Sequence, residues 1–291
     1  MESDRRVAAR EEIPLAFECG GERLYGLLHN AEAPSGYGVL IVVGGPQTRV
    51  GSHRQFVLLA RSLAANRIPV LRFDYRGIGD ATGSPETFQT IDSDIRRAID
   101  ILIERQSKIG KIILWGLCDA ASAAMFYAFQ DPRVKGLVLV NPDTLTVTSE
   151  ARTYLKHYYV RKIFDGEMWR KILHGRFDYR ESILSLTRTI ANLASSRLKR
   201  ISGEINTPFP ERMRKSLAQF KHPILLILSG RDLTADAFRD LINSSDQWLQ
   251  ILSPENLVTR HTLEEADHTF STRQWRDQVA AWTLDWIGKL S

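Results

Sequence analysis

The chain has 291 residues, of which 43% are hydrophobic and 25% are charged, and its formal net charge is +5 at pH 7. This composition excludes a fibrous or intrinsically disordered protein. The two cysteines, Cys19 and Cys118, are too few for a disulfide framework and favour a reducing compartment. Because no apolar run approaches the roughly 18 residues of a membrane-spanning helix, and the N-terminus lacks the apolar stretch of a signal peptide, we expect a cytoplasmic protein.

Short apolar runs alternate along the chain with longer amphipathic stretches. This alternation is typical of strands joined by crossover helices, and it predicts an α/β fold with a mostly parallel sheet. The expected strands are residues 24–28, 39–43, 69–73, 111–115, 134–140, 224–228 and 257–263. The expected helices are residues 54–65, 88–105, 120–129, 236–243 and 272–290.

The alternation stops after Pro142. Apolar residues then recur at helical spacing over residues 183–201, as on one face of an amphipathic helix. We therefore predict a core of residues 1–142 and 222–291 that flanks the sheet with helices, and a helical cap insertion of residues 143–221.

Basic residues are concentrated in this insertion. Residues 150–221 hold 16 Lys and Arg against 7 Asp and Glu, a local charge of +9, whereas the rest of the chain carries −4. This asymmetry favours an anionic or carrier-bound acyl substrate, or peripheral contact with an acidic membrane surface or partner. The alternative is that the basic residues only form a solvated helical face. No nucleic-acid partner is expected, because the basic residues are not interleaved with aromatic residues and no nucleic-acid-binding motif accompanies them.

The segment G-L-C-D-A places Cys118 between a predicted strand and a predicted helix. Gly116 and Ala120 are small, as required where a sharp strand-to-helix turn presents a nucleophile. A thiol at a helix N-terminus is expected to have a lowered pKa. The alternative is an inert, buried cysteine.

A nucleophile on such a turn works with an acid and then a histidine, each in a loop just past a strand. Asp232 follows the predicted strand 224–228, and His268 follows the strand 257–263. The predicted triad is therefore Cys118 as nucleophile, His268 as base and Asp232 as the acid that orients the imidazole. The rival residues, which fall inside a predicted strand or helix, are His261, Asp236 and Asp240.

Two further segments belong to the same pattern: V-V-G-G-P-Q at 42–47 and F-D-Y-R-G-I-G-D at 73–80. With the nucleophile turn and the acid–histidine order, they make the chain resemble the α/β-hydrolase superfamily over residues 15–145 and 222–290. The resemblance implies that the first segment supplies an oxyanion-hole N–H. The second is similar to the Asp-x-Arg-Gly-x-Gly turn of many members.

The strings G-S-H-R-Q-F at 51–56 and W-G-L-C-D-A-A-S at 115–122 are more particular. They resemble a bacterial subgroup of hydrolases associated with the exosortase A system, which is linked to exopolysaccharide and protein sorting. A cysteine in place of the usual serine resembles the dienelactone-hydrolase branch. We expect it to exist as a thiolate–imidazolium pair before attack, and to prefer esters, lactones and thioesters over amides, because a thiolate is easily expelled by an amide adduct.

The oxyanion hole is expected to combine the backbone N–H of Asp119 with one from the preceding loop. Pro46 has no N–H, so the second donor is Gly45 or Gln47, of which we prefer Gln47. The Asp119 carboxylate would raise the pKa of the adjacent thiol unless it points away or is paired.

Three arginines, Arg49, Arg54 and Arg76, fall in loops at the carboxyl edge of the predicted sheet. They are candidates to bind substrate or to neutralise Asp119, and the alternative is that they are solvated or pair with local aspartates. His53 is a candidate to orient the oxyanion loop and contact substrate. Asp74 is expected to brace its own turn.

These residues predict a hydrolase of carboxylic esters or thioesters that needs neither a cofactor nor a metal. Two alternatives remain open. The same acyl-cysteine could be intercepted by a hydroxyl group instead of water, which would make the protein an acyltransferase. The fold could also serve as a catalytically silent binding or scaffold protein.

Overall fold

The computed structural model describes residues 12–45, 47–84, 86–144, 209–253, 255 and 257–290. The predicted apolar stripe at 183–201 and most of the basic insertion lie outside these residues. Within the described part of the chain, no helix is both long and apolar enough to cross a membrane.

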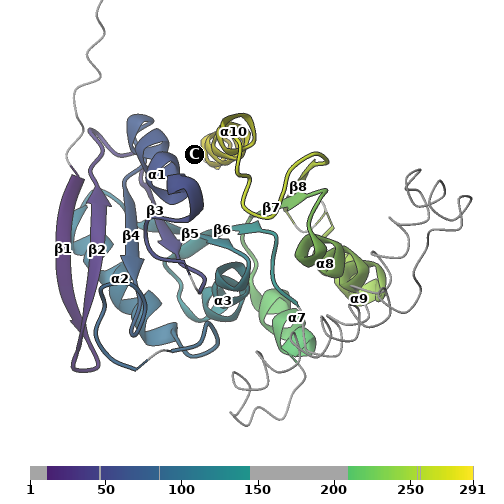
Figure 1. Ribbon diagram of the computed structural model, residues 1–291, viewed down its shortest axis with the longest axis horizontal. Helices are drawn as coiled ribbons and strands as arrows, with labels where there is room; N and C mark the ends of the chain where they lie inside the picture. Colours follow the sequence, from purple (N-terminus) through teal and green to yellow (C-terminus); the bar gives the residue numbers. More distant parts are fainter. Residues whose placement is uncertain are drawn as a thin grey trace, which may run out of the picture.

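The centre of the protein is an eight-stranded sheet with the order β1-β2-β4-β3-β5-β6-β7-β8 (Figure 1). Strands β1 and β2 pair antiparallel with each other, β2 pairs antiparallel with β4, and the remaining neighbours are parallel. This confirms the predicted α/β fold. The strands are β1 (Glu12–Cys19), β2 (Glu22–His29), β3 (Tyr37–Val42), β4 (Val70–Asp74), β5 (Lys111–Leu117), β6 (Val134–Val140), β7 (Ile224–Ser229) and β8 (Val258–Leu263).

Strand β1 is the one strand that the sequence interpretation missed. Its side chains alternate, with Leu15, Phe17 and Cys19 on the buried face and Ala16 and Glu18 exposed between them. This period of two is the signal of a half-buried edge strand. Pro14 is tolerated because β1 pairs only with β2 and needs no N–H on its outer side.

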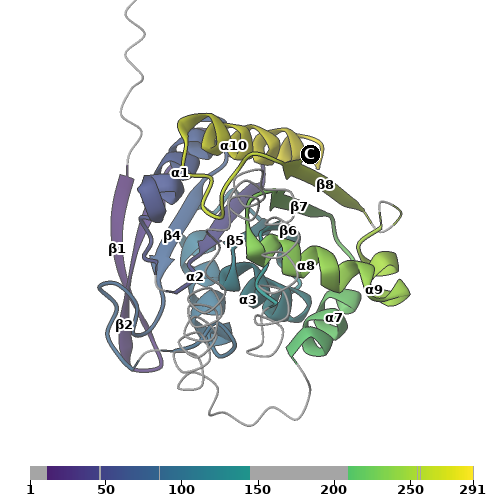
Figure 2. The same ribbon diagram turned by 45° about the vertical axis from the view of Figure 1, so that its right-hand side comes forward.

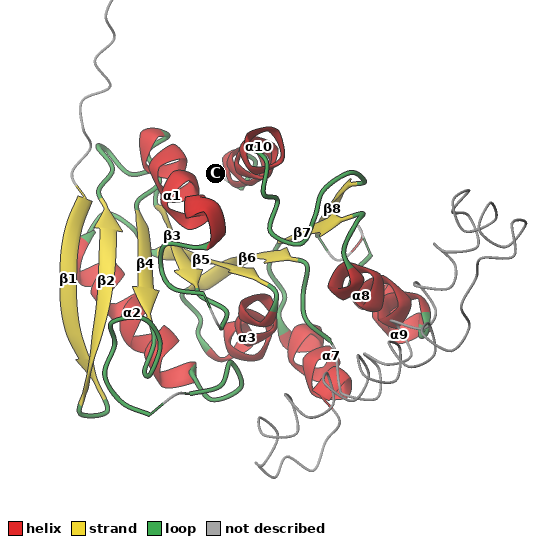
Figure 3. Ribbon diagram, viewed as in Figure 1, coloured by secondary structure: helices red, strands yellow, loops and turns green. Residues whose placement is uncertain are grey.

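Helices cover both faces of the sheet (Figures 2 and 3). One face carries α1 (Gln55–Ala65) and α10 (Arg273–Gly288), and the opposite face carries α2 (Asp92–Arg105), α3 (Asp119–Tyr127) and α7 (Phe209–Gln219). Short helices α8 (Leu233–Asn243) and α9 (Asp246–Ile251) follow β7, and 3₁₀ turns lie at Ser52–Arg54 and Ala128–Gln130.

The predicted helices are confirmed with shifted ends, and two short ones were not predicted individually. Helix α8 begins at Leu233 because the Asp232 side chain caps it, accepting hydrogen bonds from the N–H groups of Thr234 and Ala235. Helix α7 lies in the predicted insertion, and its residues Met213 and Leu217 are buried in the same core cluster as α3.

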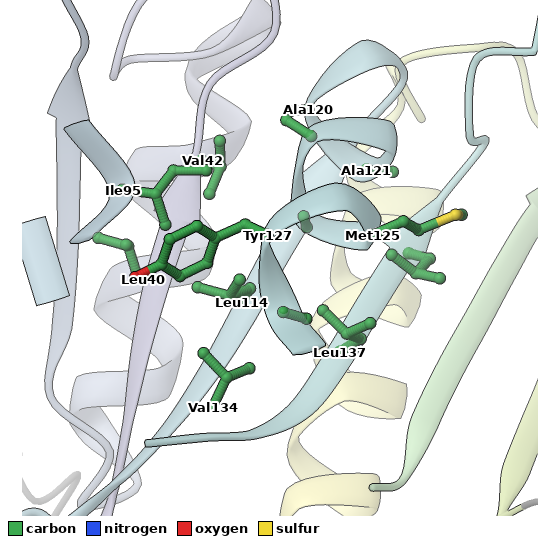
Figure 4. Packing of buried hydrophobic residues seen from close by; sticks show 14 of the residues in the cluster. Leu40, Val42, Ile95, Leu114, Ala120, Ala121, Met125, Tyr127, Val134 and Leu137 are labelled. Atoms are coloured by element: carbon green, nitrogen blue, oxygen red, sulfur yellow. The ribbon is translucent and has the colours of Figure 1, made fainter. Parts of the chain in front are cut away.

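Helix α3 is buried along its whole length. Its first turns are rich in alanine, which lets the helix lie close to the sheet, whereas Met125 and Tyr127 fill the space over Leu114 and Leu137 (Figure 4). Each large apolar side chain buried in this way contributes about 1.5–3 kcal/mol. The packing therefore holds the N-terminus of α3, where Cys118 lies, in one position.

The strand order reverses at β3. The chain runs from β3 outward to β4 and then returns to β5 on the other side of β3. The loops that follow β3 and β5 therefore diverge at the carboxyl ends of these strands, which is where ligands bind in open α/β sheets. The candidate active site lies at this edge.

Candidate active site

Cys118 occupies the tip of the turn between β5 and α3. Its backbone has φ 62° and ψ −126°, a conformation that residues other than glycine rarely adopt, and its N–H donates to Val140 O at 2.9 Å. A Cβ on Gly116 would lie 2.5 Å from Ala120 O, so the turn requires glycine there. This is the strained strand-to-helix turn that the small residues predicted.

The surroundings of the thiol oppose ionisation. Burial raises the pKa of Cys118 well above its usual range, and the carboxylates of Asp143 and Asp119 raise it further, although the Asp119 N–H hydrogen-bonds to the sulfur and lowers it. The expected lowering of this pKa is therefore wrong, because desolvation and two carboxylates outweigh the helix N-terminus. These effects disfavour the thiolate, and no hydrogen bond joins the sulfur to the His268 ring among the described residues.

His268 and Asp232 form the second half of the predicted triad. The His268 Nδ1–H donates to Asp232 Oδ2 at 2.8 Å, across loops that follow β8 and β7. The carboxylate also accepts the N–H groups of Thr234 and Ala235 at 3.1 Å each. Because Asp232 occupies Nδ1, the Nε2 atom of the neutral ring is left to accept a proton.

The carboxylates of Asp119 and Asp143, which raise the pKa of Cys118, also act on the pKa of His268. Burial lowers the pKa of His268, but the hydrogen bond and charge of Asp232, with the charges of Asp143 and Asp119, outweigh burial and raise it overall. The carboxylates thus stabilise the protonated form of the His268 ring.

Asn141, which the sequence interpretation did not single out, connects the end of β7, the loop after β8 and the turn after β5. It is fully buried, at φ 42°, directly after β6. Its Nδ2 donates to His268 O at 3.0 Å and to Ser229 Oγ at 2.9 Å, and its Oδ1 accepts the Ser229 N–H at 2.8 Å. Since the preceding Val140 O accepts from Cys118, Asn141 ties the histidine loop to the nucleophile turn. Its signal in the sequence is a polar residue ending an apolar strand.

The loop after β3 lies beside the turn of Cys118 and Asp119. A Cβ on Gly44 would lie 2.0 Å from Asp119 Oδ1, so the loop packs directly on that carboxylate. The Gln47 N–H donates to Gly44 O at 2.8 Å and is already engaged, which corrects the preference for Gln47 as oxyanion donor. The Gly45 N–H makes no hydrogen bond within the described residues. The Gln47 side chain instead holds the loop, accepting from Ser52 N–H and Gln55 Nε2 at 3.4 Å each.

Two of the candidate substrate-binding arginines have structural partners. Arg49 pairs with Asp74 and, at 2.6 Å, with Asp80. Arg76 donates to Asp94 at 2.9 Å, at the start of α2. These guanidinium groups brace the loops, which is the alternative that the sequence analysis left open for both arginines. Asp74 is fully buried and accepts the Asp80 N–H of its own turn at 3.4 Å, as predicted, and also the Arg49 N–H of the loop after β3 at 2.6 Å.

Arg54 and His53 remain exposed at the same edge. Both have positive φ angles, 60° and 52°. The pKa of Asp267 is lowered: burial raises it, but hydrogen bonds within its own loop and the charge of His53 outweigh burial. His53 therefore lies near the loop of His268.

The rival residues have other roles. The His261 ring stacks on Trp282 with centroids 4.4 Å apart, and Asp236 pairs with Arg239 at 2.7 Å. Among the described residues, no group of three or more His, Cys, Asp or Glu side chains could hold a metal ion.

Comparison with known proteins agrees with this geometry. The family model described as "Alpha/beta hydrolase family" matches residues 39–282. The chain belongs to the alpha/beta hydrolase family. None of the curated protein sequences compared with this hydrolase matches it.

Solved structures share the fold of this alpha/beta hydrolase at low sequence identity. An esterase of Pyrococcus furiosus is similar with a TM-score of 0.65 and 14% identity, covering 97% of this chain and 91% of that one. A dienelactone hydrolase of Anabaena variabilis has a TM-score of 0.60 and 16% identity, with 96% and 97% covered. An alpha-beta serine hydrolase homologue of Coxiella burnetii has a TM-score of 0.55 and 15% identity, with 92% and 96% covered.

Proposed function

We propose that this alpha/beta hydrolase cleaves carboxylic esters or thioesters through an acyl-cysteine on Cys118. His268 acts as base and then acid, and Asp232 orients its ring. The observation that carries the proposal is the strained backbone of Cys118 at the start of α3, with the Asp119 N–H directed at its sulfur. Such strain persists at functional sites where the surrounding structure imposes it.

In the first step the sulfur attacks the substrate carbonyl carbon while His268 Nε2 takes the thiol proton. The N–H groups of Asp119 and Gly45 stabilise the oxyanion. The bond to the leaving alcohol or thiol then breaks, and the imidazolium gives its proton to that group. In the second step His268 takes a proton from water, which attacks the thioester, and the acid is released as the proton returns to the sulfur.

The raised pKa of Cys118 supports proton transfer during attack, as for a serine, in place of the thiolate–imidazolium pair expected from the sequence. Asp119 and Asp143 have opposite effects on the two reacting groups. They oppose the thiolate, and they stabilise the imidazolium that forms when His268 takes the proton. Amides are disfavoured because their adduct expels thiolate more readily than amine.

The nature of the substrate rests on the charge of the insertion. Arg49 and Arg76 are engaged by aspartates. The exposed Arg54 and the +9 charge of residues 150–221 therefore remain as support for an anionic or carrier-bound acyl substrate, or for an acidic membrane or partner. The resemblance of residues 51–56 and 115–122 supports an association with exopolysaccharide or protein sorting. Both cysteines are free, which supports a cytoplasmic location.

The test is hydrolysis of p-nitrophenyl acetate and a short acyl thioester, with mass spectrometry of the protein after rapid acid quenching. We expect turnover and an acyl group on the Cys118 peptide in wild type and in the control Cys19→Ala. We expect neither in Cys118→Ala, and slow acylation in His268→Ala. Undiminished turnover in Cys118→Ala would refute the mechanism, and absence of turnover and acylation in all variants would favour the scaffold role. Faster loss of the acyl group on adding an alcohol, with ester formed, would identify an acyltransferase.

A further inference from the structure

Arg72, in the middle of β4, is a buried cation that the proposed mechanism does not use. Its side chain lies on the same face of the sheet as Val70, which shares a core cluster with α1, and it is 3% exposed. Both of its hydrogen bonds within the described residues go to uncharged acceptors: Nε donates to His29 Nε2 at 2.7 Å, and Nη1 donates to Arg49 O at 2.5 Å. Since an apolar side chain of similar length would avoid the cost of burying a charge, packing alone does not require a guanidinium group here.

The Arg49 carbonyl that Arg72 binds belongs to the loop after β3. Strand β4 holds this residue on both sides of its backbone, because its N–H donates to Asp74 Oδ1 at 2.6 Å while its C=O accepts from Arg72. The Arg49 side chain also pairs with Asp74. Arg72 and Asp74 lie two positions apart on one buried strand, so both contacts come from a single rigid element. Residue 49 is therefore a point at which the loop is fixed to the sheet.

This fixed point is close to the proposed oxyanion donor. Gly45 precedes Arg49 by four residues. A turn between them is closed by the hydrogen bond from the Gln47 N–H to Gly44 O at 2.8 Å, and a Cβ on Gly44 would lie 2.0 Å from Asp119 Oδ1, in the turn after β5. A displacement of residue 49 would therefore change where the Gly45 N–H points. Because oxyanion stabilisation requires donors held at hydrogen-bonding distance from the developing charge, such a displacement would slow the reaction.

We propose that Arg72 is a positioning residue, which holds the loop after β3 where the Gly45 N–H can stabilise the oxyanion. This role rests on the proposed function, because the charge that Gly45 meets is the oxyanion of the Cys118 adduct. His29 orients the guanidinium group by accepting from its Nε, and the ring must be neutral to do so. The ring is 2% exposed, and its other nitrogen, Nδ1, is 3.8 Å from Glu12 Oε1. An arginine suits this place because one planar group can bind two acceptors in fixed directions.

The test compares two reactions of Cys118 that differ in one respect. Acylation by p-nitrophenyl acetate passes through an oxyanion. In alkylation by iodoacetamide the sulfur displaces iodide from a methylene carbon, the thiol proton is lost to solvent, and no oxyanion forms. In Arg72→Met we expect the acylation rate and kcat to fall about tenfold or more, with KM and the alkylation rate near those of wild type.

The matched control is Arg67→Met. Arg67 Nε donates to Ala33 O at 2.8 Å, a similar contact with a loop carbonyl at the opposite end of β4, so this variant should react as wild type does. His29→Leu should slow acylation as Arg72→Met does. His29→Gln should restore it, because the glutamine oxygen can accept from Arg72 Nε.

Hydrogen exchange, measured by mass spectrometry of the peptides that cover residues 44–51, follows the same contact without turnover. Exchange should be faster in Arg72→Met than in wild type and Arg67→Met. Acylation at the wild-type rate or unchanged loop exchange in folded Arg72→Met would overturn the proposal, and so would equal losses of acylation and alkylation. If the wild type itself is not acylated, the proposed function fails, and loop exchange alone then decides whether Arg72 anchors the loop. Melting curves establish that each variant is folded, and the two His29 variants provide the comparison if Arg72→Met is not.

Discussion

The amide of Asn141 allows a sharp test of how the active-site edge is held together. In Asn141→Asp, Oδ1 can still accept the Ser229 N–H at 2.8 Å, and the Ser229 hydroxyl can rotate to donate. The oxygen that replaces Nδ2, however, would face His268 O, which was 3.0 Å from its donor. A buried carbonyl would lose its hydrogen bond and meet a carboxylate in its place.

The size of the effect follows from this one contact. Leaving a buried polar group without its hydrogen bond costs about 1–3 kcal/mol, and the facing carboxylate adds to it, so we expect a loss of about 2–4 kcal/mol at pH 8. The pKa of the introduced carboxyl is raised in the folded state, because burial and the facing oxygen oppose ionisation. Stability is therefore highest below the unfolded pKa and is lost as pH rises through the folded pKa. At low pH the protonated carboxyl can donate, and part of the loss is recovered.

Thermal unfolding of wild type, Asn141→Asp and the exposed control Asn243→Asp, compared from pH 5 to pH 8, measures this dependence. At pH 8 the melting temperature of Asn141→Asp should fall by about 5–10 °C, on a scale of about 2–4 °C per kcal/mol, and the deficit should shrink at pH 5. The displaced His268 loop should also lower kcat. A deficit that is the same at both pH values, or equal to that of Asn243→Asp, would show that the Asn141 amide does not donate to the histidine loop.

Three further predictions follow from single contacts. In Gly116→Ala the added Cβ lies 2.5 Å from the backbone of Ala120, so the substitution should abolish activity and lower the free energy of unfolding by about 3 kcal/mol or more. In the control Gly110→Ala the added Cβ meets no atom within 4 Å, so neither property should change, and equal activity of the two variants would refute the requirement for glycine at position 116. Because the pKa of Cys118 is raised, its alkylation by iodoacetamide, followed by peptide mass spectrometry with Cys118→Ala as control, should be slow at pH 7 and rise beyond pH 9; a fast plateau near neutrality would contradict this. Burial, and then the charge of Arg72, lower the pKa of His29 from 6.5 to about 4. As pH falls between these two values, His29 is protonated in the unfolded chain but not in the folded protein, so the folded state loses stability. Urea unfolding should therefore show a loss of about 3 kcal/mol from pH 7 to pH 4 that is absent in His29→Gln, and parallel pH profiles would refute it.

The fold and the meeting of Asp232 with His268 could be predicted from the sequence because both depend on local pattern. Apolar runs in strand-sized lengths predicted β2 to β8, and the carboxyl ends of parallel strands meet at one edge of a sheet. Residues placed just after such strands, Asp232 and His268, were therefore expected near the turn of Cys118. Their hydrogen bond at 2.8 Å agrees with that reasoning.

What could not be predicted is which groups surround these residues. Arg49 pairs with Asp74, 25 positions away, and Asn141 binds His268, 127 positions away. Such contacts are made by loops that only packing brings together, so no local pattern encodes them. The same holds for the engaged Gln47 N–H, which depends on how the loop after β3 turns.

The ionisation of Cys118 is the clearest case. Its place at a helix N-terminus favours thiolate, and that part was visible in the order of strand, cysteine and helix. Its pKa is nevertheless raised, because burial removes water and Asp143, delivered by the neighbouring strand β6, adds negative charge. The residue type and its backbone position come from the local sequence. Solvent exposure and distant charges come from the tertiary structure, and for this partly buried thiol they outweigh the helix N-terminus in setting the pKa.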